Sequence, residues 1–173
     1  PYCQKVWMTL KEKRIPYKIE FLNMRCYGDK PASFTRLQPS GQIPVAIIDG
    51  RVYGQSNDIL FKLEDDFSEY KSLKPSPGQE ARAQELLRLE RKLFSAWMSW
   101  LTAGERYKDL FVETLQQVEA SITGPFFLGD KVTLVDFQFA PFLERMAASM
   151  IYYKGFVMRV PGKTTKYPKL NRW

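Results

Sequence analysis

The sequence predicts two parts, an α/β part over residues 1–68 and an all-helical part over residues 80–173. In the first part the apolar periodicity changes repeatedly between that of a helix and that of a strand. From residue 80 onward it keeps the helical repeat. Between them, residues 69–79 are rich in Lys, Ser and Pro and poor in apolar side chains, which is typical of a linker.

The first predicted element is a helix over residues 1–13. Proline favours the first helical position, because its missing N–H would have no partner there. Pro16 then ends the helix. Residues at helical spacing make one apolar face, while Lys5 falls on the polar one. This apolar face consists of Cys3, Val6, Trp7 and Leu10.

A strand, a helix and a hairpin are predicted next. Tyr17, Ile19 and Phe21 alternate with polar residues, as in a half-buried strand. Residues 31–37 predict a short helix. The apolar run 45–48 is followed by the turn dipeptide Asp-Gly and by a returning run, which indicates a two-residue β-hairpin.

A third helix is predicted to begin at Ser56 or Asn57, because both residue types are good N-caps. The resulting order of elements, helix–strand–helix–strand–strand–helix, is that of a thioredoxin-like domain without its first strand. Such a sheet would lose a central parallel member. We therefore expect that strand to precede Pro1.

The second part is predicted to hold three main helices. A long one covers 80–101 and ends before Gly104, and another covers 107–122 and ends before the Gly-Pro pair at 124–125. Thr133 and Asp136 have the spacing of a capping box, which starts a very apolar helix. The aromatic side chains at helical spacing are expected to form the core.

Composition excludes several classes of function. With no histidine, histidine-based acid–base catalysis and most metal sites are excluded, so no metal is expected. Two cysteines do not make a disulfide framework, which favours a reducing compartment; Cys26 is expected to be structural. No apolar run approaches the roughly 20 residues of a membrane span.

The net charge of +7 is concentrated at the end of the chain. Residues 154–173 carry basic side chains and no acidic ones, while the rest is nearly neutral. Without interleaved aromatic and basic residues, this pattern does not indicate nucleic-acid binding. Two readings stay open: a solvated surface segment, or a surface that docks on an acidic partner or membrane face.

Five short motifs, in order, resemble the glutathione transferase superfamily, especially its omega, lambda and dehydroascorbate-reductase classes. Segments near residues 144–155 are similar to a plant and algal branch. The resemblance spans the whole chain and implies a thioredoxin-like domain that binds glutathione, followed by the family's helical domain. The motifs are Pro1-Tyr2-Cys3-Gln4-Lys5-Val6-Trp7, Gln42-Ile43-Pro44-Val45, Gln55-Ser56, Gly129-Asp130 with Thr133 and Asp136, and Tyr167-Pro168 with Trp173.

The resemblance also implies a glutathione site. Ile43 before a cis Pro44 would offer backbone groups to the cysteinyl part of the tripeptide. Ser56 and the helix N-terminus suit the γ-glutamyl carboxylate, and Gln55 the α-amino end. Lys30 resembles an omega-class lysine that contacts the glycine carboxylate. Ser56 as a simple cap and Lys30 as a surface charge stay open as alternatives.

In the thiol classes of this family the nucleophile is the residue just before the Pro-Tyr pair, which here would precede Pro1. Cys3 would then be a second thiol. Its place in the first helical turn favours a lowered thiol pKa, although Cys3 also fits the apolar face as an inert residue. A cysteine before Pro1 implies a glutathione-dependent thiol transferase or reductase, and a serine implies conjugation to electrophiles.

The alternative reading is a non-catalytic subunit with the same fold that docks in a larger assembly. The catalytic reading implies glutathione as co-substrate together with a small electrophile or disulfide. A homodimer or a larger assembly stays open. A soluble protein of the cytoplasm or the plastid stroma is expected.

Overall fold

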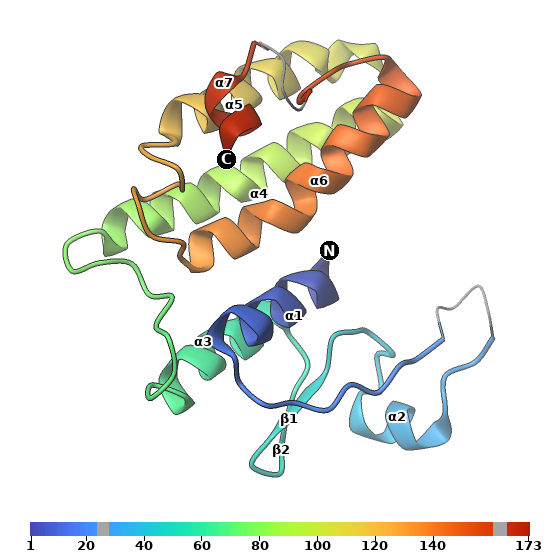
Figure 1. Ribbon diagram of the computed structural model, residues 1–173. Helices are drawn as coiled ribbons and strands as arrows, with labels where there is room; N and C mark the ends of the chain where they lie inside the picture. The colour runs from blue at the N-terminus through green and yellow to red at the C-terminus, as the bar shows by residue number, and fades with distance from the viewer. Residues whose placement is uncertain (24–27, 161–165) are drawn as a thin grey trace. The chain divides into compact units, whose positions relative to one another are not determined.

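The computed structural model describes residues 1–23, 28–160 and 166–173, so Cys26 lies outside the described residues. The chain divides into two compact units, Pro1–Ser72 and Leu73–Trp173 (Figure 1). The first unit combines helices with a small sheet, and the second is helical. Each is described below by itself.

The first unit is built around a β-hairpin and two longer helices. Ala46 pairs with Tyr53 and Ile48 with Arg51 in antiparallel register. At the turn, Asp49 and Gly50 have φ of 48° and 77°, the left-handed values that a two-residue hairpin turn requires. The predicted hairpin is therefore confirmed. The elements are α1 (Tyr2–Lys13), α2 (Ala32–Leu37), β1 (Ala46–Ile48), β2 (Arg51–Tyr53) and α3 (Ser56–Asp66).

The strand predicted over residues 17–21 is wrong, because residues 15–23 have no regular secondary structure. Within the described part of the chain the only sheet consists of β1 and β2, which pair with each other. In this part of the chain, residues 17–21 therefore have no strand beside them. An alternation of apolar and polar residues does not make a strand without a hydrogen-bonded neighbouring strand. The Tyr17 hydroxyl instead accepts a hydrogen bond from Trp7 Nε1 at 2.6 Å.

The buried face of α1 also differs from the prediction. Trp7 is 42% exposed and Cys3 is exposed, whereas Lys5 and Lys13 are buried. Lys13 is held by an ion pair of 2.8 Å with the buried Glu64 of α3, and its Nζ also donates to the carbonyl of Lys71 at 3.0 Å. Pairing of this kind lets charged side chains occupy the face that packs on α3.

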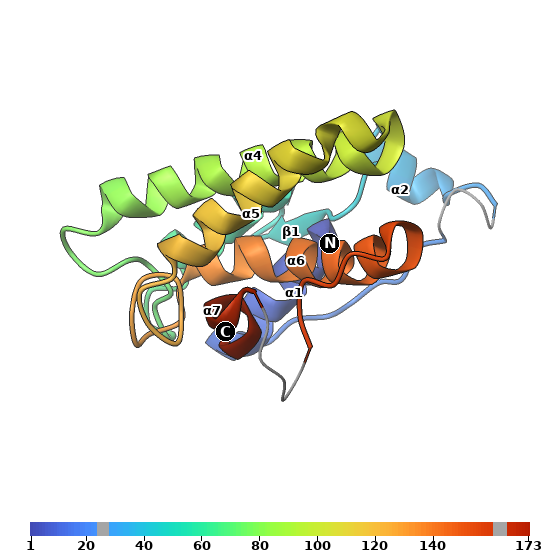
Figure 2. The same ribbon diagram turned by 90° about the horizontal axis from the view of Figure 1, so that it is seen from above.

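In the second unit, α4 lies alongside α5 and α6, as both views show (Figures 1 and 2). Gly104 ends α4, and Gly155 ends α6 in the left-handed conformation that favours glycine. The elements are α4 (Glu80–Ala103), η2 (Glu105–Tyr107), α5 (Lys108–Ser121), α6 (Leu134–Lys154) and α7 (Pro168–Arg172).

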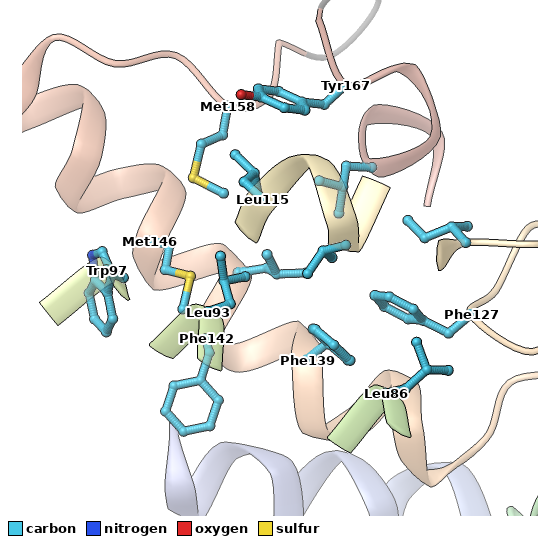
Figure 3. Close-up of a cluster of buried hydrophobic side chains, with 14 of the residues drawn as sticks. Leu86, Leu93, Trp97, Leu115, Phe127, Phe139, Phe142, Met146, Met158 and Tyr167 are labelled. Carbon is cyan, nitrogen blue, oxygen red and sulfur yellow. The ribbon is translucent and has the colours of Figure 1, made fainter. Parts of the chain in front are cut away.

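Aromatic and aliphatic side chains fill the core of the second unit (Figure 3). Phe127 stacks on Phe139 with ring centroids 4.1 Å apart, and Trp100 lies 5.4 Å from Phe111. The helical aromatic residues thus form the core as predicted. The labelled members in Figure 3 are Leu86, Leu93, Trp97, Leu115, Phe127, Phe139, Phe142, Met146, Met158 and Tyr167.

A buried carboxylate starts α6. Asp136 Oδ2 accepts the backbone N–H of Thr133 at 2.9 Å, and the two residues form a complete capping box, as predicted. The other carboxylate oxygen, Oδ1, accepts the backbone N–H of Phe127 at 3.0 Å and Nε1 of Trp173 at 2.9 Å. Asp136 therefore joins the helix start, the preceding loop and the end of α7.

Candidate functional site

The candidate site begins at the open end of the hairpin. Ala46 and Tyr53 form the pair farthest from the turn. The chain enters that pair from Ile43–Pro44, whose peptide bond is cis, and leaves it toward Gln55 and Ser56. One residue, Val45, separates Pro44 from Ala46, and one, Gly54, separates Tyr53 from Gln55. The hairpin register therefore brings these two segments of the predicted site to one end of the sheet.

At this end α3 begins. The helix begins at Ser56, as predicted, but its N-cap is Gln55, in an extended conformation, and not Ser56 or Asn57. Ser56 is the first helical residue and is only 8% exposed, while Gln55 is exposed. The first N–H groups of a helix have no partner within the helix, and together with the helix dipole they attract an anion.

The start of α1 is tied to the start of α3 by one side chain. Lys5 is 3% exposed, and its Nζ donates a short hydrogen bond to the side-chain oxygen of Asn57. The ammonium also lies 5.7 Å from the ring centroid of Tyr2. Cys3 on α1 and Ser56 on α3 therefore belong to helix ends that a direct contact links.

Lys30 reaches the loop that precedes the cis proline. A Cβ at Gly41 would lie 4.0 Å from the Lys30 Cδ atom, so the lysine stem runs in contact with this loop. Lys30 itself is half-buried.

Gln38 is a residue near the site that the sequence did not single out. A Cβ at Gly54 would come within 2.3 Å of Gln38 Nε2, so the amide rests directly on the glycine backbone. Gly54 lies between the hairpin and Gln55, and Gln38 is the C-cap of α2. The only signal in the sequence was a glycine between a strand and a helix, which is typical of a close approach.

Comparison with known proteins gives two family matches. The model described as "Glutathione S-transferase, N-terminal domain" matches residues 1–66, and "Glutathione S-transferase, C-terminal domain" matches residues 83–173. The chain belongs to the glutathione S-transferase family. The resemblance and the fold class predicted from the sequence are both confirmed.

One curated relative is glutathione S-transferase DHAR2 of Arabidopsis thaliana, which is 32% identical over 90% of this chain and 71% of its own length. Across the curated plant relatives compared, the chain spans from 55% to 71% of their length. Relatives whose names mark them as chloroplastic and as cytosolic both occur.

Solved structures agree with the family assignment. Glutathione transferase Omega 3C from Trametes versicolor superposes with a TM-score of 0.81 at 26% identity, over 90% of this chain and 72% of that one. The dehydroascorbate reductase of Chlamydomonas reinhardtii gives a TM-score of 0.72 at 24% identity, over 99% of this chain and 77% of that one. The latter likeness supports the transferase fold alone.

Cys3 differs from what the sequence predicted. The residue is exposed on α1, so it is not an inert core residue. Its thiol is nevertheless partly withdrawn from water, and this desolvation raises its pKa above the ordinary value. A backbone hydrogen bond opposes the rise without cancelling it. The expected lowering of the Cys3 pKa in this transferase-family chain is therefore wrong.

The site offers three sources of positive potential: the N-terminus of α1, the N-terminus of α3 and the buried ammonium of Lys5. Such a site suits anionic groups. Across the residues that the structure describes, no cluster of three or more His, Cys, Asp or Glu side chains could hold a metal ion. Nor does any helix in that part of this transferase-family chain have the length and apolar character to cross a membrane.

Proposed function

We propose that this protein binds glutathione and uses it in thiol transfer or reduction. One observation carries the proposal: the hairpin register brings Ile43–Pro44 and Gln55–Ser56 to the same end of the sheet, beside the linked starts of α1 and α3. We assign this binding function to residues 1–68. The name of the curated relative, a glutathione S-transferase, supports the use of glutathione.

Each part of glutathione has a counterpart in this arrangement. The backbone of Ile43 pairs with the cysteinyl amide groups of the tripeptide. The γ-glutamyl carboxylate takes N–H donors at the start of α3 and the hydroxyl of Ser56, with Gln55 toward the α-amino group. Lys30 pairs with the glycine carboxylate. This places the glutathione sulfur toward the start of α1.

The chemistry depends on the residue before Pro1 in the full-length protein. A cysteine thiolate there would attack one sulfur of a substrate disulfide, forming a mixed disulfide and releasing the other sulfur as a thiolate. A glutathione thiolate would then displace the protein thiolate. For dehydroascorbate, two glutathione molecules supply two electrons and two protons and leave as glutathione disulfide. A serine at that position would favour conjugation instead.

The non-catalytic alternative has no finding in its favour and becomes an outcome of the test. Location in the cytoplasm or in the plastid is compatible with the names of the relatives. A small disulfide, dehydroascorbate or an electrophile is the expected second substrate.

Calorimetric titration with glutathione tests the proposal. Ser56→Ala removes a hydroxyl from the carboxylate site and is expected to weaken binding by about tenfold, the effect of losing one hydrogen bond to a charged group. Ser68→Ala is the matched control, because Ser68 is an exposed serine just beyond the other end of α3. Unchanged affinity in Ser56→Ala would contradict the assigned site. No binding by the unmodified protein would overturn the proposal and favour the non-catalytic subunit.

A further inference from the structure

Lys5 is a buried lysine beside the proposed glutathione site. It is 3% exposed, although it stands one turn from the start of α1. Burial of an ammonium group is unfavourable unless its hydrogens are taken up by acceptors. The structure provides such an acceptor in the side-chain oxygen of Asn57.

The position of Asn57 determines which parts of the proposed site this contact connects. Asn57 directly follows Ser56 in the first turn of α3, and Lys5 is two residues beyond Cys3 in α1. The Lys5–Asn57 hydrogen bond thus spans the carboxylate end and the thiol end of the proposed glutathione site. An amide oxygen is a neutral acceptor, so this bond orients the ammonium without neutralising it.

Charge is the second contribution of Lys5. In a partly buried site the effective dielectric constant is far below that of water, so an ammonium several ångströms from a carboxylate still attracts it by an amount that matters for affinity. The ammonium also lies 5.7 Å from the centroid of the Tyr2 ring, a cation–π distance that favours this position. Lys5 is therefore held in place at the junction of the two helices.

We propose that Lys5 is a positioning residue that fixes the start of α3 against the start of α1 and adds its charge to recognition of the γ-glutamyl carboxylate. The inference rests on the proposed function, since it concerns the same site. It assigns to Lys5 and Asn57 a role in distinguishing glutathione from a thiol that lacks the γ-glutamyl group.

The experiment compares two ligands by calorimetry: glutathione, and cysteinylglycine, which keeps the thiol and the glycine carboxylate but lacks the γ-glutamyl group. Lys5→Met keeps most of the side-chain stem and removes the charge. It is expected to weaken glutathione binding about tenfold and cysteinylglycine binding less than twofold. A merely structural loss would weaken both ligands alike. Lys11→Met, on the same helix but exposed, is the matched control and should change neither affinity.

Asn57→Ala keeps the test decisive if Lys5→Met fails to fold, because Asn57 is an exposed residue whose truncation the fold should tolerate. Asn57→Ala should also reduce the preference for glutathione over cysteinylglycine. In the double variant with Lys5→Met, the loss of preference should be smaller than the sum of the losses in the two single variants. An unchanged preference in both single variants, or in Asn57→Ala alone if Lys5→Met does not fold, would overturn the inference. If the unmodified protein binds no glutathione, the proposed function fails instead.

Discussion

The two units of this protein differ in how buried polar side chains join their helices. In the first, the buried side chains of α1 and α3 include charged and polar groups beside aliphatic ones, and one ion pair between the two helices has side chains that are 0% and 2% exposed. In the second, the space between α4, α5 and α6 is filled by aromatic and aliphatic side chains. The buried polar residues of the first unit are Lys5, Thr9, Lys13, Ser56 and Glu64.

This difference follows from what each unit must do. Apolar packing is insensitive to direction, whereas a hydrogen bond or ion pair fixes one side chain against another within narrow limits of distance and angle. The first unit carries the candidate site, and its polar contacts join the helix that bears Cys3 to the helix that begins at Ser56. In the second unit, the buried hydroxyls of Thr114 and Ser121 donate to carbonyls of their own helix, and Asp136 is an exception that joins separate segments.

That exception is the strongest test of the comparison. Asp136→Ala removes the acceptor of the buried backbone N–H groups of Thr133 and Phe127 and of the partly buried Nε1–H of Trp173. Buried donors without acceptors are costly, so the free energy of unfolding should fall by about 4 kcal/mol. Urea unfolding followed by tryptophan fluorescence measures this loss. The control is Asp130→Ala, because Asp130 is an exposed aspartate in the same loop. A loss below about 1 kcal/mol in Asp136→Ala would refute the proposed role of the Asp136 carboxylate.

The next prediction concerns the ion pair of the first unit. Lys13→Met leaves the Glu64 carboxylate buried without its ammonium partner and should lower stability by about 3 kcal/mol. Replacing both residues, in Lys13→Met with Glu64→Leu, should recover much of this loss, because no charge is then left buried alone. Hydrogen exchange in peptides from α3 measures the loss and the recovery of stability at this helix. A double variant that is less stable than Lys13→Met would contradict this account.

A pair of identical substitutions compares the units directly. A Cβ at Gly124, in the second unit, would lie 2.7 Å from the backbone oxygen of Gly129, and backbone cannot move away easily. Gly124→Ala should therefore cost about 2 kcal/mol. At Gly54 the obstacle is the mobile end of the Gln38 side chain, so Gly54→Ala should cost less than about 1 kcal/mol. Chemical denaturation measures the loss of stability in each variant. Adding Gln38→Ala to Gly54→Ala should remove the remaining loss. A larger loss in Gly54→Ala than in Gly124→Ala would contradict the prediction.

Elements that depend on residues adjacent in the sequence were predictable from the sequence. The Asp49–Gly50 turn, the Thr133–Asp136 capping box and the glycine that ends α4 are all local signals, and all three are present in the structure. The strand expected over residues 17–21 was wrong because a strand also needs a neighbour, which a single segment does not reveal.

The buried face of α1 could not be predicted for a similar reason. Lys5 and Lys13 are inside because Asn57 and Glu64, about 50 residues further along the chain, accept their hydrogens. Helical periodicity counts a lysine as polar and assigns it to the surface. The candidate site residues were chosen by resemblance, and their roles in binding stay predictions.

The smallest expected effect is in the reactivity of Cys3. Desolvation raises the pKa of this thiol, so less thiolate is present at neutral pH than in a free cysteine. In a Cys26→Ser variant of residues 1–173, where Cys3 is then the only thiol, the rate of alkylation by iodoacetamide should rise with pH to a midpoint above that of free cysteine. The sign follows because only the thiolate reacts, and the raised pKa delays its formation as the pH increases. Unfolding in urea should restore the ordinary midpoint, which serves as the internal control. A midpoint below that of free cysteine in the folded protein would show instead that the start of α1 stabilises the thiolate, and would favour Cys3 as a reactive second thiol.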